Sequence, residues 1–266
     1  MRKKVRFYTL APLPHPYILL NANRPKIYIP KKYKEKVESI ILDAGVEIFR
    51  DPKVKDYPKG HIEKLISLHE KLKKIFTKAE IWVTVPDYPD DYHPRNLWVS
   101  EEKTNIERTL DNVLQCTSKY QEISWLIPIQ GWNKTPESVR RSVKGLRNHG
   151  ILKQYDYFGI ANLCVENDLR IVYQTVKLVH KLLPEKKLHV FGLKLRGVPL
   201  VKDYIFSFDS MAWTRPLNKT LKTKYGNFSW KTTEQAREYF KVWLERLNYY
   251  LSQSSLSEFK EEKRNE

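Results

Sequence analysis

The sequence predicts a single (β/α)8 barrel, the TIM-barrel fold of the α/β class, for three reasons. The chain has 266 residues, and one such barrel typically takes about 250. Strand-like apolar runs alternate with segments of helical period from about residue 39 onward, which favours a parallel sheet. Several of these runs end in a polar side chain, where barrel enzymes keep their chemistry. An open doubly wound sheet is the alternative, but no glycine-rich phosphate motif follows the first strand.

Eight apolar runs are the predicted strands, provided that the first two belong to the barrel. They cover residues 5–10, 17–20, 39–42, 80–85, 124–129, 156–161, 187–193 and 204–208. Apolar residues at helical spacing predict helices between them, over residues 61–77, 101–120, 135–148, 168–183, 198–203 and 232–252. Residues 1–252 are therefore predicted to form one domain, and the charged residues 253–266 a frayed tail.

The charge of the chain predicts a polyanionic partner. Its 48 Lys and Arg residues exceed its 31 Asp and Glu residues and give a net charge of +17. Lys and Arg that neutralise phosphates release counterions and so drive nucleic-acid binding. A heat-adapted surface is the alternative explanation, although such surfaces balance their signs more often.

Several function classes are disfavoured by what the sequence contains. Cys116 and Cys164 lie far apart and form no CxxC pair, so the sequence offers no local zinc site. No metal site or cofactor is expected. No apolar run reaches the roughly 18 residues of a membrane span. The apolar stretch after residues 1–4 is too short for a signal peptide. We therefore expect a cytoplasmic protein with no membrane partner.

The predicted strands are followed by an ordered set of motifs. In chain order, these are LDAG at 42–45, PD at 86–87, IPIQG at 127–131, GIANLCV at 159–165, LHVFGL at 188–193, FD at 208–209 and TR at 214–215. This ordered set resembles the guanine transglycosylases. This family comprises the tRNA-guanine transglycosylases (queuine tRNA-ribosyltransferases) and their DNA-modifying paralogues, which insert 7-deazaguanine bases into nucleic acid. The resemblance covers roughly residues 39–215, and it also implies a (β/α)8 barrel.

The resemblance implies roles for two acids. Asp209 matches the nucleophilic aspartate, whose carboxylate attacks the anomeric carbon, expels guanine and holds the sugar as a covalent ester. Asp43 matches the general acid/base that protonates the departing base and deprotonates the incoming one. Local sequence alone favours an N-cap or an ion-paired strand-end acid at Asp209 and also allows a turn-forming role for Asp43. Within the ordered set of motifs, the catalytic roles are favoured.

The resemblance also implies a base-reading set. Asp87 matches the aspartate that accepts the N1–H and N2–H2 donors of guanine, and Gln130 matches a glutamine that binds its carbonyl, with Gly131 leaving room beside it. Asn162 is a departure, because the family shows paired glycines where this chain has Ala161-Asn162. A side chain at 162 is predicted either to crowd the base or to add an amide contact. The acid that follows this motif in the family falls at Asn167, between Glu166 and Asp168.

A larger departure lies beyond the nucleophile. The family's Cys/His zinc cluster is missing, since no Cys or His follows Arg215. A basic, aromatic stretch takes its place, and we expect it to contact the nucleic acid through Arg215, Lys219, Lys222 and Lys224. The side chains of Trp98, Trp132 and Trp213 are candidates for stacking on the extruded base.

These observations favour a nucleic-acid guanine transglycosylase that needs no cofactor and takes a 7-deazaguanine base. DNA is slightly favoured over tRNA, because the zinc cluster and an appended RNA-binding domain are missing. Two hypotheses of other classes stay open: an inactive basic barrel that only binds nucleic acid, and a hydrolase of small glycosides, which leaves the net charge unexplained. The sequence does not decide between a monomer and a homodimer.

Overall fold

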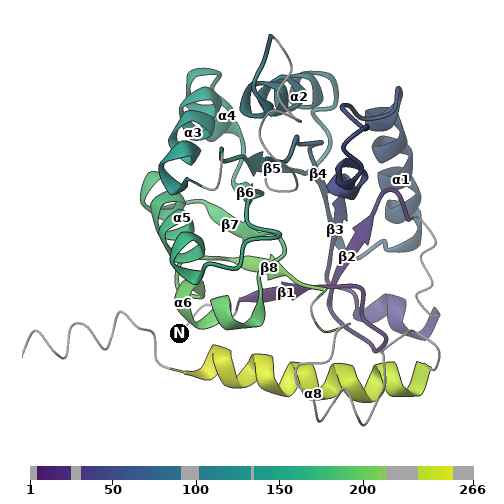
Figure 1. The fold of residues 1–266 in the computed structure, drawn as a ribbon. Helices are drawn as coiled ribbons and strands as arrows, with labels where there is room; N and C mark the ends of the chain where they lie inside the picture. Colours follow the sequence, from purple (N-terminus) through teal and green to yellow (C-terminus); the bar gives the residue numbers. More distant parts are fainter. Residues whose placement is uncertain are drawn as a thin grey trace, which may run out of the picture.

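Eight parallel strands form the sheet of the computed structural model, which describes residues 5–24, 31–90, 102–132, 135–211, 213 and 233–253 (Figure 1). The sheet order is β1-β8-β7-β6-β5-β4-β3-β2. The strands are β1 (Arg6–Tyr8), β2 (Tyr17–Asn21), β3 (Ser39–Asp43), β4 (Glu80–Thr84), β5 (Trp125–Ile129), β6 (Tyr157–Ile160), β7 (Lys187–Val190) and β8 (Ser207–Asp209). This order is that of a (β/α)8 barrel, so the predicted fold class is confirmed.

The barrel closes between its first two strands. Just after β1, Thr9 forms a parallel bridge with Ile18 of β2. The Thr9 amide donates to the Tyr17 carbonyl at 3.3 Å, and the Leu19 amide donates to the Thr9 carbonyl at 3.2 Å. Both early apolar runs therefore belong to the barrel, as the strand count required.

Helices cover the outside of the strands (Figure 1). The α-helices are α1 (His61–Ile75), α2 (Asn105–Lys119), α3 (Val139–Asn148), α4 (Ile151–Gln154), α5 (Leu169–Leu182), α6 (Val198–Val201) and α8 (Thr233–Ser252). Short 3-10 helices span Lys31–Lys36, Val46–Arg50, Pro136–Ser138 and Leu195–Gly197. The last helix, α8, packs Trp243 against Phe7 of β1, with ring centroids 4.8 Å apart. No helix in the described part is long and apolar enough to cross a membrane.

Residue alternation along the strands decides which side chains reach the barrel interior. On β3, Ile40 and Leu42 belong to the large core between strands and helices, whereas Ile41 belongs to a separate cluster inside the barrel. The same alternation places Asp43 on the inner face of β3. On β8, Phe208 packs outward, which places Ser207 and Asp209 on the inner face. Two predicted catalytic acids thus end their strands facing the barrel axis.

Some element boundaries differ from those predicted. The helix expected from residue 101 begins at Asn105, because Thr104 caps it. The Thr104 hydroxyl accepts from the Glu107 amide, and the Glu107 carboxylate accepts from the Thr104 amide, which satisfies two donors of the first turn. The last strand, expected over residues 204–208, is shifted to Ser207–Asp209. Asp209 is therefore held by strand pairing rather than lying in the loop beyond it.

Candidate active site at the carboxyl ends of the strands

Asp209 is a buried carboxylate with one oxygen held in place. It is the last residue of β8 and only 6% exposed. Its Oδ1 atom accepts a hydrogen bond from the Gly192 amide at 3.0 Å and lies 3.2 Å from His189 Nε2. Its Oδ2 atom makes no hydrogen bond to the described residues. One oxygen is thus fixed by β7 and the turn after it, while the other is left for a ligand.

Asp43 is held in a similar way at the end of β3. Its Oδ1 atom accepts from the Gly45 amide at 2.9 Å, and Gly45 has a φ of 87°. A Cβ atom at Gly45 would approach Asn23 Nδ2 to 2.3 Å, so glycine is required for this tight turn. Burial of the carboxyl group, together with the charges of Glu47 and Asp209, raises the pKa of Asp43 to about 7, although the hydrogen bond from Gly45 lowers it.

The electrostatic effect of Asp209 on Asp43 shows that the two predicted catalytic acids act on one another. A negative charge nearby disfavours ionisation of a carboxyl group. The raised pKa of Asp43 keeps this group protonated up to about neutral pH. The barrel thus brings together one carboxyl group suited to proton transfer and one suited to nucleophilic attack.

Asp87 and Gln130, the predicted base-reading pair, are in direct contact. Asp87 follows β4 and Gln130 follows β5, and both are buried. The Gln130 amide donates from Nε2 to Asp87 Oδ2, which orients the Gln130 side chain. Gln130 Oε1 is buried and has no hydrogen-bond partner among the described residues. A buried acceptor without a partner is costly, so this atom is a candidate contact for a bound base.

Asn162 lies directly beside Gly131. An added Cβ atom at Gly131 would approach Asn162 Nδ2 to 2.0 Å and Cγ to 2.7 Å. The Asn162 side chain is 2% exposed, and neither Oδ1 nor Nδ2 has a partner within the described part of the chain. The Asn162 side chain therefore fills the space beside Gly131, the residue that follows Gln130. It brings a side-chain amide without a described hydrogen-bond partner close to the base-reading residues. The glycine at 131 makes room for this neighbour.

A Gly131→Ala substitution tests this contact. We expect it to destabilise the protein by about 1–3 kcal/mol, because the methyl group overlaps the Asn162 amide. Adding Asn162→Ala removes the overlapping atoms, so the double variant should be about as stable as Asn162→Ala alone. Urea denaturation of the four proteins measures this. Equal stability of Gly131→Ala and the unchanged protein would contradict the placement of Asn162.

The three residues that follow the GIANLCV motif have separate roles. Asp168 caps α5 by accepting from the Arg170 amide at 2.8 Å, and it also pairs with the Arg170 guanidinium at 2.9 Å. Asn167 accepts from Lys194 Nζ at 2.5 Å. Glu166 is buried, and its Oε1 accepts from the Asn167 and Asp168 amides. Asp168 is thus committed to a helix N-terminus, where its charge is favourable.

Two residues of the site were missed by the sequence analysis. Tyr57 donates from its hydroxyl to the Asp87 carbonyl at 2.9 Å. Burial raises the pKa of Tyr57, and the charges of Asp87 and Asp43 add to this shift. His189 contacts Asp209 from β7. The signal for His189 was present, because it alternates with the outward Leu188 and Val190 of an apolar strand; nothing in the irregular segment around Tyr57 indicated its position.

The predicted stacking role of Trp213 is wrong. Its side chain is fully buried in the outer core, its Nε1 donates to Thr9 Oγ1 at 2.8 Å, and its ring packs on Phe240 with centroids 5.0 Å apart. Trp132 is partly buried and remains a candidate. The predicted stacking residue Trp98 and the predicted nucleic-acid contacts lie outside the described residues; those contacts are Arg215, Lys219, Lys222 and Lys224.

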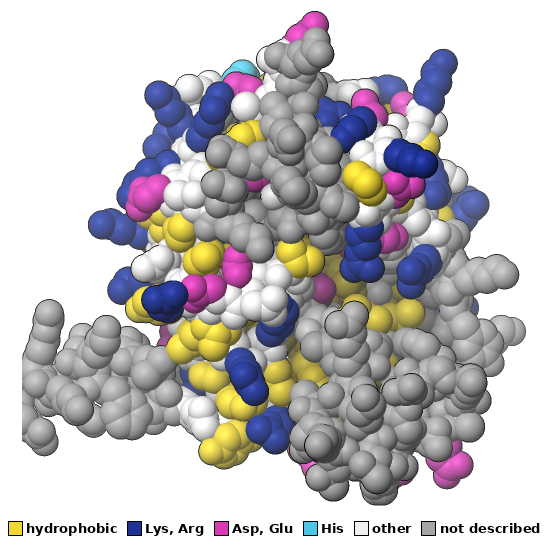
Figure 2. Space-filling view, viewed as in Figure 1, with side chains coloured by type: hydrophobic (Ala, Val, Ile, Leu, Met, Phe, Trp, Pro, Cys, Tyr) yellow, Lys and Arg dark blue, Asp and Glu magenta, His cyan; other side chains and the backbone are white. Residues whose placement is uncertain are grey.

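Basic side chains are spread over the visible face of the molecule rather than gathered in one patch (Figure 2). Acidic side chains lie between them. Some basic side chains are neutralised by surface ion pairs, such as Arg141–Glu107 at 2.7 Å and Lys119–Glu63 at 3.2 Å. Among the residues with described positions, no group of three His, Cys, Asp or Glu side chains could hold a metal ion.

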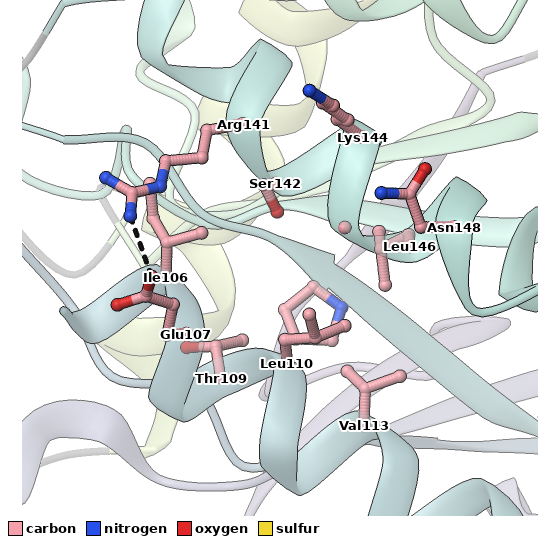
Figure 3. A pocket seen from close by; sticks show the side chains of 12 residues that line it. Ile106, Glu107, Thr109, Leu110, Val113, Arg141, Ser142, Lys144, Leu146 and Asn148 are labelled. Carbon is pink, nitrogen blue, oxygen red and sulfur yellow. Dashed lines mark hydrogen bonds and ion pairs between the residues drawn. The ribbon is translucent and has the colours of Figure 1, made fainter. Parts of the chain in front are cut away.

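A cavity of about 290 Å³ lies outside the barrel, between α2 and α3 (Figure 3). Its walls are largely apolar, with Leu110 and Val113 from α2 and Leu146 from α3, and the Arg141–Glu107 ion pair lies at its edge. None of the predicted site residues lines this cavity. It is separate from the candidate active site.

Comparisons with known proteins leave the family open. No protein-family model matches the sequence, and no curated protein is significantly similar to it. Among solved structures, the HMG-CoA lyase from Brucella melitensis is 11% identical, with a TM-score of 0.43, and the match covers 91% of this chain and 93% of that one. The carboxyl transferase domain of Rhizobium etli pyruvate carboxylase is 10% identical, with a TM-score of 0.36 and coverage of 96% and 49%. Similarities this low assign neither a family nor a role to this chain.

Proposed function

We propose that this chain is a nucleic-acid guanine transglycosylase, which exchanges guanine for a 7-deazaguanine through a covalent aspartyl-sugar intermediate. The observation that carries the proposal is that Asp43 and Asp209 end β3 and β8 on the inner face of the barrel, where the charge of Asp209 contributes to the raised pKa of Asp43. One carboxylate has a fixed oxygen and an open one, and the other carboxyl group has a pKa of about 7. Nucleophile and acid/base in separate electrostatic environments are what a double displacement requires.

The proposed reaction has two displacements at the anomeric carbon. Asp209 Oδ2 attacks this carbon while the bond to guanine breaks, and Asp43 gives its proton to the departing base. The incoming 7-deazaguanine then transfers a proton to the Asp43 carboxylate and attacks the same carbon, which breaks the ester to Asp209. Each step transfers one proton through Asp43, and the cycle returns both acids to their starting states.

Base recognition is assigned to the neighbouring polar groups. Gln130 Oε1 and the amide of Asn162 are buried hydrogen-bonding groups whose partners a purine would supply. The carboxylate of Asp87 accepts from the Gln130 amide and so orients it. We assign this carboxylate to the same base-reading group as the amides of Gln130 and Asn162. A purine edge carries adjacent donors and acceptors, which matches an arrangement of one carboxylate and two amides.

The partner polymer is nucleic acid, for which the net charge of +17 is the main support. DNA is favoured slightly over tRNA, because no Cys or His follows Arg215 to form the zinc cluster of the tRNA enzymes. A base inside a duplex has to be extruded before its glycosidic bond can be reached. Because basic side chains that neutralise phosphates release counterions, we expect the affinity for nucleic acid to fall strongly with rising salt concentration.

Incubation with radiolabelled guanine and either duplex DNA or unmodified tRNA tests this function. We expect label to enter DNA and to be chased out by a 7-deazaguanine base. Incorporation into tRNA alone would assign the tRNA reaction instead. Tight, salt-sensitive binding without any incorporation would favour an inactive binding barrel, and release of free guanine without incorporation would identify a hydrolase.

A further inference from the structure

A series of buried polar side chains runs along the inside of the barrel to Asp209. The Tyr157 hydroxyl lies 2.5 Å from Ser207 Oγ, Ser207 Oγ lies 2.8 Å from His189 Nδ1, and His189 Nε2 lies 3.2 Å from Asp209 Oδ1. These residues come from the adjacent strands β6, β7 and β8. Tyr157, Ser207 and His189 are each 0% exposed. The series connects the core of the barrel to the proposed nucleophile.

The chemistry of the groups fixes where each hydrogen lies. An ionised Asp209 can only accept, so His189 must donate from Nε2. If the ring carries only this proton, Nδ1 accepts from the Ser207 hydroxyl, whose oxygen accepts from Tyr157. Burial raises the pKa of Tyr157 well above its ordinary value, so this hydroxyl keeps its proton. The whole series is satisfied by one arrangement of hydrogens.

The ring of His189 is also held by packing. It makes edge contacts with Tyr8 at 5.8 Å and with Phe191 at 4.5 Å between centroids. With Ser207 bonded to the opposite nitrogen, the ring has little freedom to turn away from Asp209. A buried histidine needs partners for both nitrogens, and here one of those partners is the carboxylate assigned to attack the sugar.

We propose that His189 is a positioning residue for Asp209, an inference that rests on the proposed function. The Nε2–H of His189 and the Gly192 amide both bind Oδ1, so the carboxylate cannot rotate and Oδ2 stays directed at the anomeric carbon. The same two donors stabilise the negative charge that returns to Asp209 when the sugar ester breaks. Ser207 and Tyr157 act one step further away, by keeping the proton of His189 on Nε2.

Two substitutions of His189 separate positioning from packing. His189→Gln can place an amide N–H near the former Nε2 position, whereas His189→Asn is too short to reach Asp209. We expect His189→Asn to lose about 10²-fold in kcat for base exchange with little change in KM, because misplacing a reacting group by about 1 Å has an effect of this size. His189→Gln should retain most of the kcat. His149→Gln, at an exposed histidine, is the matched control and should behave as the unchanged protein.

The position of the proton gives a measurement that does not depend on activity. Nitrogen-15 NMR of the histidines, with the His189 signals assigned by their loss in His189→Gln, should show a proton on Nε2 and a bare Nδ1. Tyr157→Phe removes only the hydroxyl at the end of the series and should lower kcat less than His189→Asn does. Thermal unfolding of each variant confirms that it folds.

The results distinguish failure of this inference from failure of the proposed function. If the unchanged protein exchanges guanine but His189→Asn matches it, or His189→Gln loses as much as His189→Asn, then His189 does not position Asp209. A His189 proton on Nδ1 alone also overturns the inference. If the unchanged protein exchanges no base, the proposed function fails, and the role of His189 in that reaction fails with it, whatever the NMR shows of the contact.

Discussion

An Asp209→Asn variant is expected to lose base exchange by on the order of 10⁴-fold or more, because a neutral amide oxygen cannot form the covalent ester with the sugar. The amide can still accept from the Gly192 amide and from His189 through its Oδ1 atom, as the carboxylate does. The fold and the affinity for nucleic acid should therefore be retained. Exchange of labelled guanine, together with a denaturing gel of protein trapped on the polymer, measures both activity and intermediate.

The matched control for this variant is Asp203→Asn, at an exposed aspartate six residues earlier in the chain. It carries the same charge change and should leave exchange and trapping unaltered. Persistent exchange in Asp209→Asn at more than a few per cent would assign the nucleophile to another group. An unchanged amount of trapped adduct in Asp209→Asn would likewise assign the nucleophile to another group, because the amide cannot form the ester.

An Asp43→Asn variant is expected to reduce exchange by about 10²–10⁴-fold, the usual contribution of general acid–base catalysis. With a pKa of about 7, Asp43 donates its proton as guanine departs, so the first displacement should slow as the pH rises through 7. The variant has no such group, so the rate of its first displacement should no longer fall as the pH rises through 7. Single-turnover formation of the covalent adduct between pH 5 and 9 measures it. If the rate of the variant still falls near pH 7, the general acid is a residue other than Asp43.

The same substitution should change stability in a pH-dependent way. The pKa of Asp43 is raised from 3.8 to about 7 by burial, so the folded protein binds more protons than the unfolded chain between these values. Stability is therefore lost as the pH rises from about 4 to 7. Because Asp43 is only partly buried, solvent screens part of the effect, and we expect Asp43→Asn to be more stable by about 2 kcal/mol at pH 8.

At pH 4 this difference between Asp43→Asn and the unchanged protein should vanish, since the folded and unfolded states both hold the proton there. Urea denaturation at the two pH values measures the change, and comparison with Asp203→Asn removes the contribution of net charge. A variant that is less stable than the unchanged protein at pH 8 would mean that the Asp43 carboxylate is favourably paired in the fold.

The sequence was sufficient to predict the barrel because its strands are buried on both faces. Runs such as residues 125–129 of β5 are continuously apolar, and they alternate with helical segments, which together indicate parallel strands under helices. Strand direction also places polar residues that follow each run at one end of the barrel. Asp43, Gln130 and Asp209 were found by this rule, which needs no knowledge of contacts.

What the sequence could not determine depends on residues far apart in the chain. The contact of Gln130 with Asp87 spans 43 residues, that of His189 with Asp209 spans 20, and the burial of Trp213 depends on Thr9 and Phe240. The raised pKa of Asp43 is likewise a product of burial and of charges brought near it.

By itself, the sequence determined the class of fold and which end of the barrel carries the polar residues, because periodicity and strand direction are local properties of the chain. Only the tertiary structure decided which of these residues meet, which oxygen of each carboxylate is held, and how far the pKa of Asp43 is raised, because hydrogen bonding and desolvation depend on neighbours that chain order does not specify.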